Sequence, residues 1–295
     1  MSEQLSRRAL LLGGSALAVT AACGGDKDKD LKVSDTTTTQ RERDLLQVVQ
    51  AGFNFQTGIE ERLTFALLQG VPPTLFRGSG EVQVAFQKPG TQVLTPPVVA
   101  ERKSSGIEDR PYYVVRQTLD VPGNWGLQAT VAGRRPGNLV FQVDEADSVK
   151  WPTPGKALPK TKTPTALDAM GVNPICTRAA GTCPFHAASL DKLLGNGKPT
   201  IVLLATPALC KSATCGPVLD ILMAETEAHL GALNVVHIEI FTDDTGKTTS
   251  PSFAAFNLVN EPVCYFADTR GIVTERFNGA FDHSEAKAAV ERLLA

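Results

Sequence analysis

Two hydrophobic patterns follow one another along this chain of 295 residues. Between residues 41 and 149, short runs of β-branched and aromatic residues partly alternate with polar ones, and Gly and Pro turns separate them. This pattern is typical of an all-β sandwich. The predicted strands cover residues 62–68, 81–86, 112–119, 125–131 and 139–143.

From residue 166 to residue 295 the apolar runs alternate between strand and helix periods, which predicts an α/β domain. The predicted strands are 200–205, 234–241, 263–267 and 272–277. The predicted helices are 189–194, 215–230, 252–258 and 284–294. Asp282 or Ser284 is the expected cap of the last helix.

The remaining segments are expected to connect or to target these domains. Residues 150–165 are Pro-rich and predict a linker, and residues 24–40 are charged and Thr-rich, which predicts a flexible tether. Residues 1–23 carry Arg7-Arg8 before a short apolar run, which resembles a twin-arginine export signal. Thr20-Ala21-Ala22-Cys23 resembles a bacterial lipobox, so Cys23 is the expected lipidation site. The alternative is a plain signal peptide.

Export predicts an oxidising compartment outside the cytoplasmic membrane, where disulfides persist. The formal net charge of -2 gives no electrostatic reason to expect a nucleic-acid partner. Beyond Cys23 the chain has an odd number of cysteines, so one is left unpaired if the others form disulfides. The four histidines are scattered without zinc-type spacing, and we expect no metal or organic cofactor.

Cys210 and Cys215 stand where a predicted buried strand, Ile201 to Ala205, leads into an amphipathic helix. A helix N-terminus stabilises a thiolate, which favours redox chemistry there. Two helical residues five apart have Cα atoms roughly 8.6 Å apart, too far for a disulfide. Either the helix therefore begins at Cys215, with Thr214 as its cap, or oxidation unwinds a turn.

The order of elements from residue 166 onward resembles the thioredoxin fold. Cysteines follow a buried strand, Asn260-Glu261-Pro262 precedes the strand 263–267, and glycines mark the turns around the last strand. The resemblance implies that Pro262 is cis and lies beside the active cysteines. In the preceding domain, the turn Val121–Gly126 resembles the immunoglobulin-like YtkA/FixH-type domains of bacterial envelope proteins, where a spacer or docking role is expected.

The cysteine spacing also resembles peroxiredoxins of the bacterioferritin-comigratory type. Thr206-Pro207 precedes Cys210, but Thr206 lies four residues before it rather than three. Arg270 and Arg276 are the available candidates for the partner arginine of a peroxidase.

Three further cysteines have less specific surroundings. Cys176 and Cys183 enclose a short loop, and a structural disulfide is expected between them, with a second redox pair as the alternative. Cys264 is expected to be a core thiol, or else a partner in a mixed disulfide. His186 is expected at the surface, and His237 is expected to pack or to meet solvent.

These patterns predict a membrane-tethered thioredoxin-like protein of the cell envelope that exchanges protein thiols and disulfides. Cys210 is the expected attacking thiolate, although the sequence leaves the choice between Cys210 and Cys215 open. Cys215 would then resolve the mixed disulfide, and Pro262 would shape the groove. The alternatives are a thiol peroxidase that uses the same pair and a non-catalytic binding module with structural disulfides.

Overall fold

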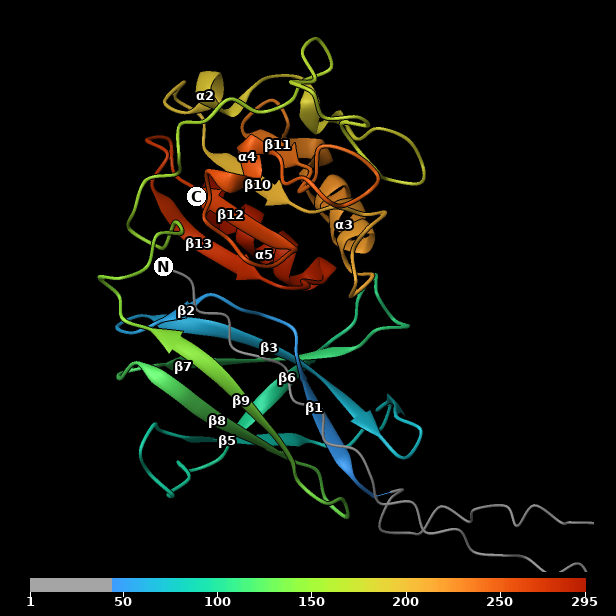
Figure 1. The fold of residues 1–295 in the computed structure, drawn as a ribbon, viewed down its shortest axis with the longest axis vertical. Helices are drawn as coiled ribbons and strands as arrows, with labels where there is room; N and C mark the ends of the chain where they lie inside the picture. Colours follow the sequence, from blue (N-terminus) through green and yellow to red (C-terminus); the bar gives the residue numbers. More distant parts are fainter. Residues whose placement is uncertain (1–43) are drawn as a thin grey trace, which may run out of the picture. The chain divides into compact units, whose positions relative to one another are not determined.

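The computed structural model describes residues 44–295 (Figure 1). The predicted signal segment 1–23 with Cys23 and the predicted tether 24–40 lie outside the described residues. Among the described residues, no helix combines the length and the apolar content needed to cross a bilayer. Residues 44–295 all belong to one compact unit, whose N-terminal part is all β and whose C-terminal part is α/β.

The strands of the N-terminal part come from short runs of β-forming residues. They are β1 (Leu46–Gln50), β2 (Phe55–Gln56), β3 (Glu60–Gln69), β4 (Thr74–Leu75), β5 (Val82–Gln87), β6 (Val98–Lys103), β7 (Tyr112–Thr118), β8 (Gly123–Thr130) and β9 (Gly137–Asp144). All five strands predicted in this region are present.

These strands form a curled sheet in the order β1-β3-β7-β6-β5-β8-β9-β2, with β4 paired to β3. The sheet is continuous because β6 changes partners along its length. Val98–Ala100 pairs with β5, and Glu101–Lys103 pairs with β7. Alternating apolar residues point inward, and Trp125, Phe65 and Phe86 are among the fully buried side chains of this core. The sandwich expected from the sequence is thus one curled sheet around a single core.

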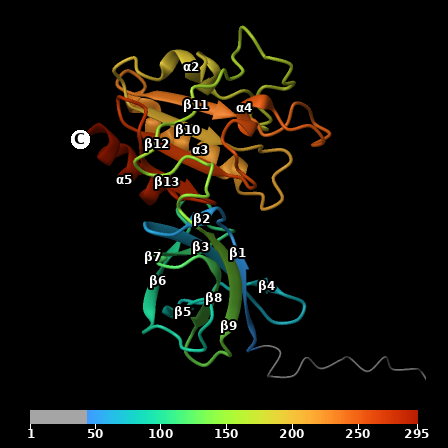
Figure 2. The same ribbon diagram turned by 60° about the vertical axis from the view of Figure 1, so that its left-hand side comes forward.

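The C-terminal part contains a second, smaller sheet with helices on both faces (Figure 2). Its elements are η1 (Pro184–His186), α2 (Leu190–Leu193), β10 (Thr200–Leu204), α3 (Cys215–Thr226), η2 (Glu227–His229), β11 (Asn234–Ile238), α4 (Pro251–Ala254), β12 (Val263–Ala267), β13 (Val273–Asn278) and α5 (His283–Leu294). The strand order is β11-β10-β12-β13, with β10 parallel to β11 and antiparallel to β12.

Both faces of this sheet are covered, because every residue of β10 and of β12 is buried. Ile201 and Leu203 belong to a cluster with residues of α3 and α5, whereas Val202 and Leu204 belong to a cluster with residues of α2 and α4. Asp282 caps α5 by accepting a hydrogen bond from the backbone N–H of Glu285, and it is one of the two caps that the sequence predicted. This sandwiching of a four-stranded sheet is the arrangement of a thioredoxin-like fold.

The Pro-rich segment 150–165 is placed against the second sheet. The backbone N–H groups of Gly155 and Leu158 donate to the carbonyls of Val273 and Gly271, and Val273 donates back to Lys156. The segment therefore extends the edge of β13 over a few residues. This part of the predicted linker is therefore held by backbone hydrogen bonds to β13. The Pro-rich composition did not predict these bonds.

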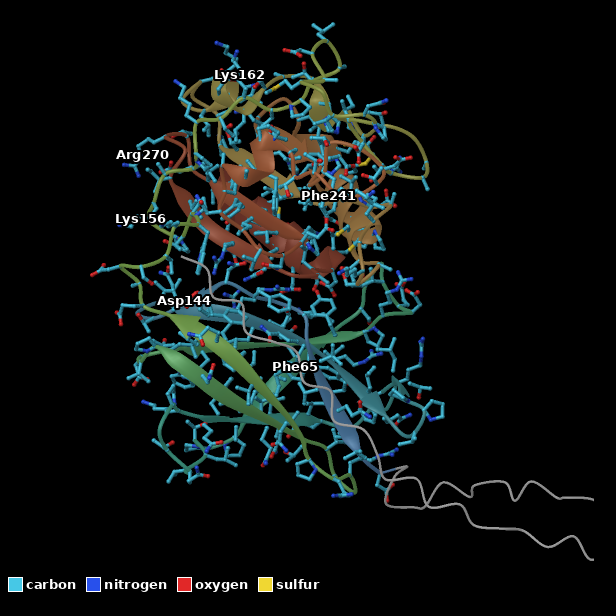
Figure 3. All side chains as sticks on the ribbon, viewed as in Figure 1. Phe65, Asp144, Lys156, Lys162, Phe241 and Arg270 are labelled. Carbon is cyan, nitrogen blue, oxygen red and sulfur yellow. The ribbon has the colours of Figure 1, made fainter. Side chains whose placement is uncertain are left out.

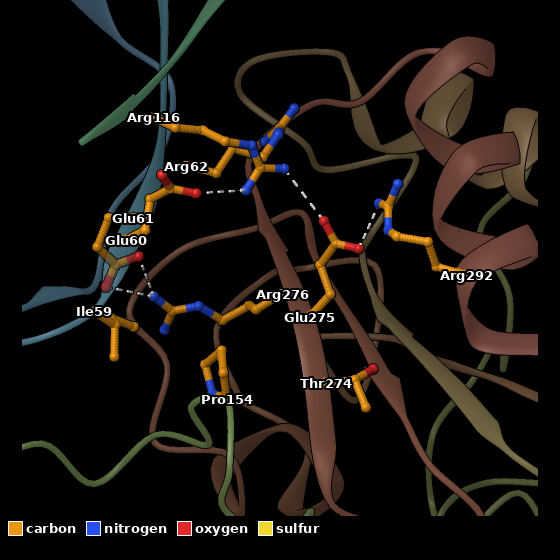
Figure 4. A pocket seen from close by; sticks show the side chains of 10 residues that line it. All are labelled: Ile59, Glu60, Glu61, Arg62, Arg116, Pro154, Thr274, Glu275, Arg276 and Arg292. Atoms are coloured by element: carbon orange, nitrogen blue, oxygen red, sulfur yellow. Dashed lines mark hydrogen bonds and ion pairs between the residues drawn. The ribbon is translucent and has the colours of Figure 1, made fainter. Parts of the chain in front are cut away.

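Buried ion pairs join the curled sheet to the second sheet. Arg62 of β3 donates to Glu285 of α5 at 2.8 Å, and Arg276 of β13 donates to Glu61 of β3 at 3.0 Å. The side chains of both pairs are less than 10% exposed. They border a cavity of about 540 Å³ whose charged lining is largely paired (Figure 4). Each carboxylate that lines this pocket forms an ion pair with an arginine: Glu60, Glu61 and Glu275.

Candidate functional site

The loop between β10 and α3 carries the two cysteines that the sequence singled out. β10 ends at Leu204, and α3 begins at Cys215, so Cys210 lies in the intervening loop. The predicted start of the helix at Cys215 is confirmed. Thr214 occupies the cap position, but its side chain makes no capping hydrogen bond and contacts Ser212 Oγ at 2.7 Å instead.

The two thiols approach one another across the start of the helix. The backbone N–H of Cys215 donates to Cys210 Sγ at 3.4 Å, and Ser212 Oγ lies 3.2 Å from the same sulfur. Both cysteines are free thiols in this structure. Their sulfurs and a carboxylate oxygen of Glu261 all lie within 4.8 Å of one another. A small movement of the loop would therefore bring the sulfurs to bonding distance.

The surroundings push the acidities of the two thiols in opposite directions. The pKa of Cys210 is lowered to about 5, mainly by the neighbouring Cys215 thiol and further by Ser212 and the first backbone N–H of α3. The pKa of Cys215 is raised, first by burial and then by its bond to Cys210 and the negative charge of Glu261. Cys210 is half-buried, whereas Cys215 is fully buried. Cys210 is thus the more acidic and the more accessible thiol of this pair.

Glu261 completes the cluster, and sequence reasoning did not assign it a role. One carboxylate oxygen accepts the Cys215 S–H at 3.4 Å and the backbone N–H of Thr206 at 2.5 Å. Its pKa is raised to about 7, mainly by burial and further by the charge of Cys210. The available signal was its position directly before Pro262, whose peptide bond is cis as predicted. A carboxyl group poised near neutrality can accept a proton from Cys215.

A groove of about 640 Å³ opens beside Cys210. Its lining residues are mostly apolar. They come from the segment between β1 and β2, the loop after β10, the segment after β11, α4 and the segment before Pro262: Phe53, Leu209, Lys211, Ser212, Ile240, Phe241, Thr249, Phe253, Leu258, Val259, Asn260 and Glu261. Phe241 is labelled in Figure 3. Val259 is 80% exposed, so its apolar side chain is accessible to a partner at this groove.

The remaining cysteines lie apart from this groove. Cys264 is fully buried on β12, and burial raises its pKa, as expected of a core thiol. Cys176 and Cys183 are buried free thiols in this structure, so the predicted disulfide between them stays a prediction. The expectation that His186 lies at the surface was wrong, because its side chain is 3% exposed and packs beside those two cysteines and His237.

The arginines considered for a peroxidase are engaged elsewhere. Arg270 pairs with Asp268 in the turn before β13 at 2.7 Å, and Arg276 pairs with Glu61. In the described part of the chain, the contacts at Cys210 come instead from Ser212 and Cys215.

Comparisons with known proteins find similarity among solved structures. No family profile matches the sequence, and no curated protein matches it. Among solved structures, MTB dsbF in its mixed oxidized and reduced forms is 19% identical with a TM-score of 0.29, covering 36% of this chain and 87% of that chain. A thioredoxin family thiol:disulfide interchange protein from Chlorobium tepidum TLS is 14% identical with a TM-score of 0.32, covering 50% and 100%. The polysaccharide lyase BACCELL_00875 is 12% identical with a TM-score of 0.21, covering 35% and 12%.

The class of the C-terminal part follows from its own topology. A buried central strand leads into cysteines at a helix start, and a cis-proline precedes the neighbouring antiparallel strand. This part of the chain is thioredoxin-like.

Proposed function

We propose that the protein is a thiol–disulfide oxidoreductase of the cell envelope that acts through Cys210 and Cys215. One observation carries this proposal: a half-buried thiol with a pKa of about 5 lies within 4.8 Å of a buried thiol and of a carboxyl group with a pKa of about 7. At neutral pH this arrangement supplies a nucleophile, a resolving thiol and a base in one place.

The reaction proceeds in two exchanges. The Cys210 thiolate attacks one sulfur of a partner disulfide, forms a mixed disulfide and expels the other partner sulfur as a thiolate. Glu261 then accepts the proton of Cys215, and the Cys215 sulfur attacks Cys210 Sγ. The new Cys210–Cys215 disulfide forms as the partner leaves with both of its sulfurs reduced. The reverse sequence oxidises a dithiol partner, and the bonds and electrons balance in either direction.

The groove beside Cys210 supports a protein substrate rather than a small thiol. Exposed Val259 and Phe53 offer apolar contacts to a peptide that presents its disulfide to Cys210. The cis-proline Pro262 follows Glu261 directly and would shape the groove. The predicted export signal and the predicted lipidation of Cys23 support partners at the outer face of the cytoplasmic membrane, with the curled sheet as the spacer or docking module.

Trapping of mixed disulfides tests this function. In Cys215→Ser the attack by Cys210 persists but resolution is lost, so the full-length variant should accumulate mixed disulfides with envelope proteins, visible as reductant-sensitive bands. Cys210→Ser is the matched control, because it keeps the buried cysteine and loses the accessible one. Equal trapping by both variants, or by neither, would contradict the proposal.

Assays with hydrogen peroxide and with a protein disulfide distinguish the peroxidase alternative from thiol–disulfide exchange. Suppose that the reduced chain consumes hydrogen peroxide in a Cys210-dependent way and leaves a protein disulfide unreduced. The exchange function would then be wrong, and the peroxidase hypothesis would replace it. If neither substrate is turned over, the non-catalytic binding module remains.

A further inference from the structure

A second cluster of reactive side chains lies outside the proposed redox site. Cys176, Cys183, His186 and His237 are 6%, 3%, 3% and 0% exposed. One sulfur or nitrogen atom from each lies within 4.8 Å of the others. Three of these residues come from the segment before α2, and His237 comes from β11, so the fold brings together groups up to 61 positions apart in the chain, from residue 176 to residue 237.

Two separations within this cluster match those expected between the ligands of a tetrahedral metal site. Zn–N bonds of about 2.0–2.1 Å and Zn–S bonds of about 2.3 Å place two nitrogens about 3.3 Å apart, and a sulfur and a nitrogen about 3.5 Å apart. His186 Nε2 lies 3.2 Å from His237 Nδ1, and Cys183 Sγ lies 3.5 Å from the same nitrogen. We propose that these four side chains bind one Zn²⁺ ion.

The surroundings of His237 prepare it as a ligand. Its Nε2 lies 2.9 Å from the backbone carbonyl of Ala205, which can only accept a hydrogen bond, so the proton resides on Nε2. The lone pair of Nδ1 then points to Cys183 and His186. A hydrogen bond from the second imidazole nitrogen to a carbonyl is the usual outer support of a metal-bound histidine, because it fixes both the tautomer and the ring orientation.

Charge balance favours a divalent ion in this buried position. Binding of Zn²⁺ replaces the protons of two thiols, which are released to solvent, and leaves two thiolates, two neutral imidazoles and the cation. The net charge of the ion and its four ligands is zero, which limits the cost of burying them beside apolar neighbours such as Phe185. Four protein ligands leave no open position, which is typical of a structural site rather than a catalytic one.

The proposed zinc site is attached to the loop that carries Cys210. Thr177 follows Cys176 directly, and its Oγ1 accepts the backbone N–H of Ala208 at 3.1 Å while donating to Glu239 at 3.0 Å. His237 donates a hydrogen bond to the carbonyl of Ala205, which lies at the start of that loop. Zinc would therefore fix the loop at two points, and its role is to position the loop rather than to take part in exchange.

Metal analysis of the full-length chain tests the proposal. The chain, purified without chelator, should contain about one zinc ion. Co²⁺ exchanged into it should give tetrahedral d–d absorption with a thiolate charge-transfer band. Zinc affinity should fall by more than about 100-fold in His186→Gln and in Cys183→Ser, beyond the roughly 10–100-fold typical of losing an outer support. The control His229→Gln, which alters a histidine outside the cluster, should keep the metal.

The double variant Cys210→Ser/Cys215→Ser separates this site from the redox pair, because it should abolish exchange and retain both the zinc and the Co²⁺ spectrum. The Co²⁺ spectrum of this double variant reports on the four proposed ligands even if a variant of one ligand fails to fold. Loss of the metal in the double variant would overturn the proposal and assign the ion to the redox cysteines. Peptide mapping that finds a Cys176–Cys183 disulfide in a zinc-free wild-type chain would also overturn it.

Discussion

The role of Glu261 can be tested by replacing its carboxylate with an amide of the same size. In Glu261→Gln the side-chain oxygen can still accept the N–H of Thr206, which now lies 2.5 Å from the carboxylate. The base beside the Cys215 thiol, 3.4 Å away, is lost. The substitution therefore removes proton acceptance while leaving most of the packing in place.

The expected effect follows from the acidities of the two groups. Burial raises the pKa of Cys215 above its ordinary value, so only a minor fraction is thiolate at neutral pH. The pKa of Glu261 is about 7, so roughly half of its carboxyl groups can accept the proton there. Positioned bases typically contribute about 10²–10⁴-fold, and we expect the resolving step to slow by about 10²-fold in the variant.

A single-turnover reaction with an aromatic disulfide reagent isolates this step. Attack by Cys210 releases one coloured thiolate, and attack by Cys215 on the mixed disulfide releases the second in a first-order phase. In the wild type the second phase should accelerate with pH and level off above about 7, because the base is active once ionised. In Glu261→Gln it should keep rising with pH as the Cys215 thiol ionises unaided.

Two controls define the result. Cys215→Ser should lack the second phase, and Glu227→Gln, which alters an exposed carboxylate in η2, should match the wild type. A second phase in Glu261→Gln within about twofold of the wild type, with the same pH profile, would refute the base role, since a real general base contributes far more.

Three further predictions concern acidity and stability. Alkylation of reduced Cys210 should show a midpoint near pH 5, and Cys215→Ala should move it upward because the Cys215 thiol is the largest stabiliser of the thiolate and alanine offers no donor; an unmoved midpoint would contradict this. The pKa of Glu261 is raised in the folded state, so its ionisation costs stability as pH rises from about 4.5 through about 7. The free energy of unfolding of Glu261→Gln in urea should therefore exceed that of the wild type by about 2–3 kcal/mol at pH 8 and equal it at pH 4. An equal gain in stability at both pH values would argue against burial as the cause of the raised pKa. Arg62→Met leaves the buried carboxylate of Glu285 unpaired and should cost about 3–5 kcal/mol in the same assay, and a cost below about 1 kcal/mol would show that the pair is not buried in solution.

Local patterns were sufficient to predict most elements near the redox site. The apolar run Ile201–Leu204 predicted β10, and the cysteine geometry predicted that α3 begins at Cys215 or unwinds on oxidation. These features depend on hydrophobic periodicity and on backbone geometry within a few residues. The strand β6 was missed because its second half, Glu101–Lys103, is charged and reads as a loop.

Contacts between distant segments could not be predicted in the same way. Glu261 reaches Cys215 across 46 positions of the chain, and His186 meets His237 across 51. Such meetings depend on strand order and on the closure of loops, which no local pattern encodes. The sequence therefore singled out the two cysteines of the proposed redox site and missed both the carboxyl group beside them and the convergence of the second cluster.

The reduction potential of the Cys210–Cys215 pair is the most direct test of the proposal that this pair exchanges thiols and disulfides. The full-length chain would be equilibrated with glutathione buffers, its free thiols trapped, and the state of this pair read by peptide mass mapping. We expect a potential between about -120 and -270 mV, the range of exchange catalysts. A potential below about -300 mV, typical of structural disulfides, or the absence of a reducible pair would contradict it.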